Sequence, residues 1–189
     1  IVFPKGIFVY DIDDIEKSAE IANNILKELE VTGVPNYFGW QRFGKPRTNT
    51  HLVGEALVQN DLKEAVRRYI GNPTSEEHEE NQKARQAYDD GNLEESLELM
   101  SKGMRYEKMM VRELIKDAKK GPLDDKAYKN ALHALPKPLQ RMFVHAYQSY
   151  LFNDAVSRRV AMGINRYVEG DIIIDNEERI VRDKTPEEF

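Results

Sequence analysis

Cysteine is absent from this chain of 189 residues. This excludes disulfide bonds, thiolate metal sites and a cysteine nucleophile. The histidines are scattered and lack the spacing of metal ligands: His51, His78, His133 and His145. No apolar run approaches the roughly 20 residues that a membrane-spanning helix needs, and the first residues lack the regions of a signal peptide. We therefore expect an internal piece of a soluble cytoplasmic protein.

Several widespread catalytic motifs are also missing. The sequence contains no G-x-x-x-x-G-K-[ST], no G-x-G-x-x-G, no H-E-x-x-H and no G-x-S-x-G. These absences argue against nucleotide hydrolases, dinucleotide enzymes and metalloproteases, and against a hydrolase with a nucleophile elbow. Because the net charge is −5, any contact with a nucleic acid has to come from local positive patches.

Acidic side chains are missing from residues 33–51, and this stretch begins with the most unusual segment of the chain. Residues 33–44, GVPNYFGWQRFG, combine three glycines, one proline and four aromatic residues with Asn36, Gln41 and Arg42. Glycine and proline at this density indicate a loop. Aromatic rings beside arginine and amide groups are typical of proteins that hold an unstacked nucleotide. Aromatic rings that fill a core beside a Gly-Pro turn would give the same composition, so both interpretations stay open here.

Most of the remaining chain shows helical periodicity. A β-branched and aromatic run at residues 6–10 predicts a strand, and residues 15–29 predict a helix that Gly33 ends. Further helices are expected at residues 62–70, 104–119, 125–132 and 139–162, whereas residues 51–58 are ambiguous. Nine acidic and two basic residues in residues 74–100 indicate solvated helices, broken at residues 90–92. Residues 171–174 and 179–182 are expected to pair as a hairpin.

Two segments resemble one known family. NYFGWQRFG at residues 36–44 resembles the NYFG-x-QRFG motif of the TruD family of pseudouridine synthases. QSYLFN at residues 148–153, with Arg158 and Arg159 soon after, resembles the Q-S-x-L-F-N end of that family's long helix. Gly170 and Asp171 before an apolar run resemble a third, weaker feature. The two main motifs lie in different halves of the chain, so the resemblance covers most of it.

The resemblance implies a reaction and roles for individual residues. Members of the family cut the N-glycosidic bond of a uridine in tRNA, turn the base and rejoin it through carbon 5, without a metal or a cofactor; the uridine expected here is uridine 13. Asn36 would help hold the catalytic aspartate, and Phe38 would pack on the base. The expected RNA contacts are Gln41, Arg42, Lys45, Arg47 and Arg158, although Arg158 could equally be an ordinary surface arginine of a helix.

One part of the family pattern is missing. The catalytic aspartate belongs to a segment of the type G-x-K-D-x-x-A-x-T-x-Q, and no such segment occurs here. Lys116-Asp117-Ala118 lies in a predicted helix and lacks the Thr-x-Gln that should follow. We therefore expect the aspartate outside this chain, and we expect these 189 residues alone to be inactive.

The fold class that we predict is α+β and rich in α-helix. Residues 1–57 would be the strand–helix–loop portion of the catalytic domain, and residues 58–189 a mostly helical, family-specific inserted domain with a short β-hairpin. The expected partner is tRNA, with no membrane, no metal and an undetermined oligomeric state. Two alternative functions stay open: a non-catalytic RNA-binding module and a helical protein-interaction domain.

Overall fold

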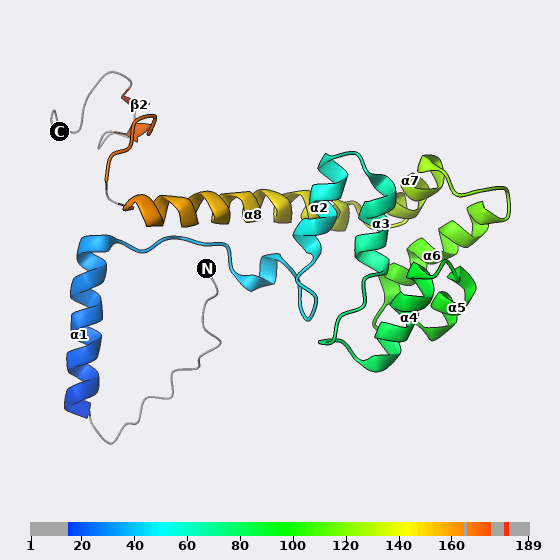
Figure 1. The fold of residues 1–189 in the computed structure, drawn as a ribbon, viewed down its shortest axis with the longest axis horizontal. Coiled ribbons are helices and arrows are strands. Elements are labelled where there is room, and N and C mark those ends of the chain that lie inside the picture. The colour runs from blue at the N-terminus through cyan, green and yellow to red at the C-terminus, as the bar shows by residue number, and fades with distance from the viewer. Residues whose placement is uncertain (1–14, 165, 175–179, 182–189) are drawn as a thin grey trace. The chain divides into compact units, whose positions relative to one another are not determined.

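The computed structural model describes residues 15–164, 166–174 and 180–181, and it is mainly helical (Figure 1). The elements are α1 (Ile15–Thr32), the 3-10 helix η1 (Trp40–Arg42), α2 (Thr50–Val58), α3 (Leu62–Ile70), α4 (Glu79–Asp89), α5 (Leu93–Leu99), α6 (Arg105–Ala118), α7 (Asp125–His133), α8 (Lys137–Met162), β1 (Ile173–Ile174) and β2 (Ile180–Val181). The chain divides into two compact units. Unit 1 comprises Ile1–Asn36 and Ala155–Phe189, and unit 2 comprises Tyr37–Asp154.

The predicted α+β fold class is wrong for the part of the chain that the structure describes. The strand–helix portion is not seen, because the run at residues 6–10 lies outside the described residues. The described strands are two residues long, and they pair antiparallel, Ile173 with Val181 and Ile174 with Ile180. A ladder of this length does not make a sheet. The physical reason for the helical fold is that apolar residues recur at steps of three and four along nearly all of the described chain.

The helices of unit 2 pack mostly as neighbours in sequence. The closest pairs are α2 with α3, α4 with α5, and α6 with α7, and α3 also packs on α7 (Figure 1). Local sequence sets their ends. Asp61 accepts a hydrogen bond from the backbone N–H of Glu64 at 2.9 Å and begins α3. Asp124 does the same for α7 through the N–H of Ala127, also at 2.9 Å. Both caps satisfy a backbone donor that the helix itself cannot pair.

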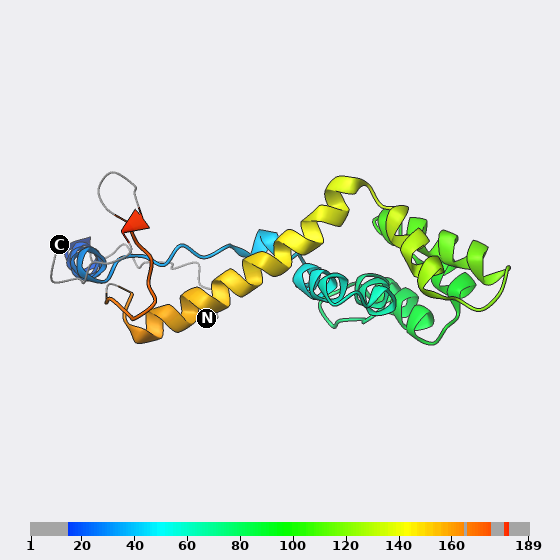
Figure 2. The same ribbon diagram turned by 90° about the horizontal axis from the view of Figure 1, so that it is seen from above.

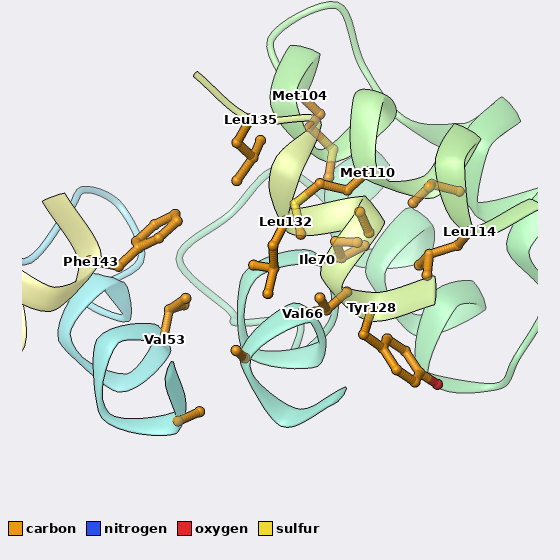
Figure 3. Close-up of a cluster of buried hydrophobic side chains, with 14 of the residues drawn as sticks. Val53, Val66, Ile70, Met104, Met110, Leu114, Tyr128, Leu132, Leu135 and Phe143 are labelled. Atoms are coloured by element: carbon orange, nitrogen blue, oxygen red, sulfur yellow. The ribbon is translucent and has the colours of Figure 1, made fainter. Parts of the chain in front are cut away.

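The core of unit 2 lies between these helices. Figure 3 shows the side chains of Val66, Ile70, Met110 and Leu132 gathered between α3, α6 and α7, with Val53 and Phe143 in the same cluster. Val66, Ile70 and Met110 are completely buried. Methionine fills irregular gaps well because its side chain is flexible. The methionine-rich face of α6 is therefore explained by packing.

One glycine brings α2 against α8. A Cβ atom added to Gly54 would lie 2.0 Å from the backbone oxygen of Phe143 and 3.0 Å from the Cβ of Tyr147. Real side chains do not approach a backbone oxygen so closely, so only glycine allows this contact. The contact places the middle of α2 on residues 143–147 of α8, directly before the QSYLFN motif.

Unit 1 contains α1, the ladder and the last turns of α8. Gly33 ends α1 with a positive φ of 71°, and its N–H donates to the carbonyl of Leu29 at 2.8 Å. Asp171 accepts from Arg159 at 2.7 Å and from the N–H of Val168 at 2.9 Å. α8 itself is one uninterrupted helix, drawn from yellow to orange in Figure 2. Among the described residues, no helix is both long and apolar enough to cross a membrane.

Candidate functional site

The segment NYFGWQRFG forms an extended run followed by one 3-10 turn. Gly39 is extended, with φ −76° and ψ 170°, and the turn η1 follows it. Gly44 has a φ of 97°, and a Cβ there would lie 2.6 Å from the carbonyl oxygen of Arg47. The N–H of Thr50 donates to the carbonyl of Phe43 at 3.1 Å, which attaches the end of the loop to the start of α2. The prediction of a loop is thus confirmed.

Phe38 lies at the centre of this loop with 40% of its surface exposed. Its ring meets the ring of Phe152 edge to face, with the centroids 5.4 Å apart and an interplanar angle of 75°. The guanidinium carbon of Arg42 lies over the same ring, 5.2 Å from its centroid. Edge-to-face rings and a cation over a ring are both favourable arrangements. The exposed ring of Phe38 therefore has one aromatic and one cationic neighbour.

The backbone of Phe38 is bound by a residue of the second motif. The N–H of Phe38 donates to Oδ1 of Asn153 at 2.9 Å, and Nδ2 of Asn153 donates to the carbonyl of Phe38 at 3.0 Å. The two residues are 115 positions apart in the sequence. The structure thus brings together the two segments on which the family resemblance depends.

A second contact between the two motifs is made of aromatic rings. His51 stacks on Tyr150 of α8 with the centroids 4.8 Å apart and an interplanar angle of 21°. Phe43 meets His51 edge to face at 5.3 Å. Tyr150 is 46% exposed, so one end of this row reaches the surface. The row fixes the end of the loop on the same helix that holds Phe38.

Burial lowers the pKa of His51 below its usual value; Glu55 opposes this shift, and Arg68 adds to it. The Nδ1 atom of His51 is buried without a hydrogen-bond partner within the protein. A neutral imidazole places less charge in this aromatic surrounding than an imidazolium would. His51 is therefore neutral at pH 7 and contributes to the site through its ring.

Arg47, which was expected to contact RNA, is buried inside the fold. It is 8% exposed, and its guanidinium donates to the carbonyls of Tyr69 at 2.9 Å and Gly71 at 2.7 Å, at the end of α3. Arg85 is also buried and donates to the carbonyl of Ile70 at 2.7 Å and to Glu77 at 2.9 Å. Burial lowers the pKa of Arg47 to about 10, so it stays charged at neutral pH. Its charge is used within the fold, and we do not retain it among the candidate RNA contacts.

The other predicted site residues are accessible. Gln41 and Lys45 are exposed in the loop, and Asn36 is exposed directly before it. Arg158 is exposed on α8 in unit 1. No three histidine, aspartate or glutamate side chains of the described residues gather as a metal site would require. Within unit 2, the loop therefore offers aromatic, amide and cationic groups.

A family model settles which group of proteins this arrangement belongs to. The model described as "tRNA pseudouridine synthase D (TruD)" matches residues 6–188. The chain belongs to the TruD family. This confirms the resemblance seen in the two motifs; the family is that of tRNA pseudouridine synthases, which are isomerases of tRNA processing.

Individual TruD relatives agree with the family model. The chain is 43% identical over 174 residues to a probable tRNA pseudouridine synthase D of Methanosarcina acetivorans, covering 88% of this chain and 38% of the relative. It is 35% identical over 184 residues to a protein of the same description from Thermococcus sibiricus, covering 95% of this chain and 41% of the relative. The chain thus spans about two fifths of the length of these relatives.

A solved TruD structure matches the fold. The crystal structure of the putative tRNA pseudouridine synthase D of Methanosarcina mazei superposes with a TM-score of 0.73 at 36% identity. The match covers 88% of this chain and 38% of that one. The fold of the described residues is therefore a TruD fold segment.

Sequence reasoning missed three residues that build the TruD loop site: Asn153, His51 and Tyr150. The signal for Asn153 and Tyr150 was present, since both belong to the QSYLFN segment. Nothing in the local sequence distinguishes His51 as a stacking residue, because its partner ring lies on α8.

Proposed function

We propose that the protein carrying this chain isomerises uridine 13 of tRNA to pseudouridine, and that this chain supplies the surface on which the target base stacks. Family membership supports the reaction class. The observation that carries the role of this chain is the ring of Phe38, exposed at the surface yet held by Phe152, Arg42 and Asn153. A uridine extracted from its stack needs such a fixed aromatic surface.

The geometry around Phe38 indicates how the base would bind. Arg42 lies over one face of the ring, so the uracil stacks on the other face. Phenylalanine suits this role because its ring carries no polar group that would compete for the base edges. The ring of Phe38 would then contact both the stacked base and the ring of Phe152, which it meets edge to face.

Asn36 and an aspartate outside these 189 residues would carry out the chemistry. The aspartate is required while the bond between the base and the sugar breaks at nitrogen 1 and forms again at carbon 5. Carbon 5 loses a proton and nitrogen 1 gains one, so the reaction is an isomerisation without another reactant. Asn36 is exposed, and its amide offers a donor and an acceptor without a charge that would shift the pKa of the carboxylate. This chain alone would be inactive.

Cationic and amide groups of the loop, and separately Arg158 of α8, would bind the RNA backbone. Gln41 and Lys45 are exposed in the same loop as Phe38, and Arg158 is exposed on α8. Contacts with phosphates position a nucleic acid without reading its sequence. We also propose that residues 1–57 belong to the catalytic domain and residues 58–189 to the inserted domain, and that the protein acts in the cytoplasm, where its tRNA substrate is.

The test is pseudouridine formation in tRNA by a protein of the relatives' full length that contains this chain. The Phe38→Ala variant should lose stacking worth about 1–3 kcal/mol, which lowers kcat/KM roughly fivefold to 150-fold. Asn36→Ala should also lower kcat. A matched control is Leu99→Ala, because Leu99 is 39% exposed, like Phe38, but lies on α5.

Each part of the proposal has its own contradicting result. Activity on a tRNA with cytidine at position 13 equal to that on the natural tRNA would exclude uridine 13 as the target. Equal activity of the Phe38→Ala and Leu99→Ala variants would exclude the stacking role. Activity of the 189-residue chain by itself would contradict an aspartate outside it.

A further inference from the structure

Asn153 pairs with Phe38 in the way that a neighbouring β-strand would. In an antiparallel ladder, one residue receives a bond from the partner's N–H and gives one to the partner's carbonyl. Here the side-chain amide of Asn153 does both, at 2.9 Å from the N–H of Phe38 and at 3.0 Å from its carbonyl oxygen. Only one orientation of the amide satisfies both bonds, so the assignment of its oxygen and nitrogen is fixed.

This pairing fixes the direction in which Phe38 points. A residue held at both its N–H and its carbonyl has little freedom to rotate its peptide planes, and its side chain stands roughly perpendicular to the extended backbone. The carbonyl of the next residue, Gly39, accepts a hydrogen bond from the N–H of Arg42 at 3.0 Å, at the turn η1. The two hydrogen bonds to the backbone of Phe38 itself come from Asn153 of α8.

The hydrogen bonds from Asn153 matter because the packing around the Phe38 ring does not hold it in one position. Phe38 is 40% exposed, and its ring contacts are one edge-to-face neighbour, Phe152, and one cation, Arg42. Phe152 itself is 45% exposed. Such contacts tolerate sliding, whereas two hydrogen bonds to the backbone do not.

We propose that Asn153 is a positioning residue of the reaction, which holds the backbone of Phe38 so that its ring is already in place when the uracil arrives. This proposal rests on the stacking role of Phe38 in the proposed function. A stacking surface that is placed before binding lowers the barrier without adding affinity for the rest of the tRNA.

The experiment uses the protein of full length with tRNA as substrate, and compares Asn153→Leu with Gln148→Leu. Leucine has nearly the shape of asparagine but makes neither bond. Gln148 is exposed on the same helix, so its replacement controls for the change of a polar α8 residue. We expect Asn153→Leu to lower kcat about tenfold to a hundredfold, as small misplacements of reacting groups do. The KM for tRNA should stay within about threefold.

A second variant covers the case in which Asn153→Leu fails to fold. Asn153→Asp is polar and isosteric, and it still accepts from the N–H of Phe38. The aspartate cannot donate to the carbonyl of Phe38. It places a negatively charged carboxylate oxygen next to that carbonyl oxygen, and the two repel each other. We expect the same loss of kcat as for Asn153→Leu. A kcat for Asn153→Asp within about twofold of the unchanged protein would overturn the proposal.

A double-mutant cycle separates positioning from any other role of Asn153. If Asn153 acts through Phe38, then Asn153→Asp or Asn153→Leu should change kcat by less than about twofold once Phe38→Ala is present. An equal loss with and without the Phe38 ring would show that Asn153 acts elsewhere, and the proposal would fail. If Phe38→Ala alone has no effect, the stacking role fails as well, so the two failures are distinguishable.

Discussion

The guanidinium groups of Arg47 and Arg85 pair the last carbonyls of α3 from outside that helix. Arg47 donates to the carbonyls of Arg68, Tyr69, Gly71 and Asn72, and Arg85 to those of Tyr69 and Ile70. The last carbonyls of a helix have no partner within it and carry partial negative charge. Glu77 and Glu107 balance the two cations. The cluster is a buried cap for α3.

Removing one cation from this cluster should be costly. Arg85→Leu leaves Glu107 without its buried partner and deprives Glu77 of its closer one, Nε of Arg85 at 2.9 Å. Breaking a buried pair from one side costs about 3–5 kcal/mol of the free energy of unfolding. Urea unfolding of the chain measures this loss. Arg112→Leu is the control, because Arg112 is exposed on α6; equal losses for both variants would contradict the cluster's role.

Local sequence does not distinguish the two roles that arginines take here. Arg42 and Arg47 both follow the aromatic run, and both were predicted as RNA contacts. What separates them is the end of α3, whose carbonyls lie 21 to 25 residues further along the chain and occupy Arg47. Arg47 is buried because it donates to backbone carbonyls that are distant in the sequence. Residue type and spacing cannot predict such a contact.

At the scale of the helix, the sequence was informative. The predicted helix after Asp61 is α3 (Leu62–Ile70), and the predicted helix of residues 139–162 is α8 (Lys137–Met162). These predictions succeeded because caps and periodic apolar residues act locally. Residues 51–58 were ambiguous; they form α2, in which Gly54 lies against Phe143 of α8.

Because α2 approaches α8 closely at Gly54, adding one methyl group there should destabilise the fold. Gly54→Ala puts a Cβ 2.0 Å from the carbonyl oxygen of Phe143, and a backbone atom cannot move aside as a side chain can. We expect a loss of about 1–3 kcal/mol or more in the free energy of unfolding. Gly103→Ala is the control, since its nearest neighbour is 3.7 Å away. Thermal unfolding compares them, and an unchanged midpoint for Gly54→Ala would contradict the close contact.

Helix α3 also predicts a pH dependence. Glu64 accepts from Nε of Arg67 at 2.7 Å and from Nε of Arg68 at 2.8 Å. The hydrogen bond from Arg67 and that from Arg68 lower the pKa of Glu64 to about 2 from 4.5. Because the pKa is lower in the folded state, the carboxylate stabilises the fold above pH 4.5, and this contribution is lost as the pH falls towards 2.

The variant Glu64→Gln should therefore lower stability at pH 7 by about 1 kcal/mol, since the pair is partly exposed and screened by solvent. The difference from the unchanged protein should shrink between pH 4.5 and pH 3. Urea unfolding at a series of pH values measures it. Glu98→Gln, on the exposed side of α5, is the control. A difference independent of pH would show that the carboxylate charge of Glu64 is not the cause.

For the molecule as a whole, the predicted fold class failed while the family resemblance succeeded. The α+β prediction relied on a strand at residues 6–10 that lies outside the described residues and on a hairpin whose described strands have two residues each. The motifs NYFGWQRFG and QSYLFN indicated the family that the family model confirms, because the first motif is long and specific and the second is moderately specific. That they meet at Phe38 and Asn153 could not be predicted, because 115 residues separate them.

The overall charge predicts how RNA binding should respond to salt. The net charge is −5, so we expect tRNA binding to depend on local cations such as Lys45. We expect Lys45→Ala to weaken tRNA binding and to reduce the slope of log K against log salt by about 1. Lys83→Ala is the control, because Lys83 pairs with Glu79 on the acidic α4 at 2.7 Å. Equal salt slopes for the two variants would contradict a phosphate contact by Lys45.

The bonds between Asn153 and Phe38 also bear on the order in which the protein folds. Most helix pairs of unit 2 join neighbours in sequence, and such short-range contacts form quickly. A contact across 115 residues closes a long loop, and it forms only after the helices between its ends have shortened the path. We therefore expect the contact between Asn153 and Phe38 to form late and to open first on heating. The exposed ring of Phe38 would then lose its position at temperatures where the helical core is still intact.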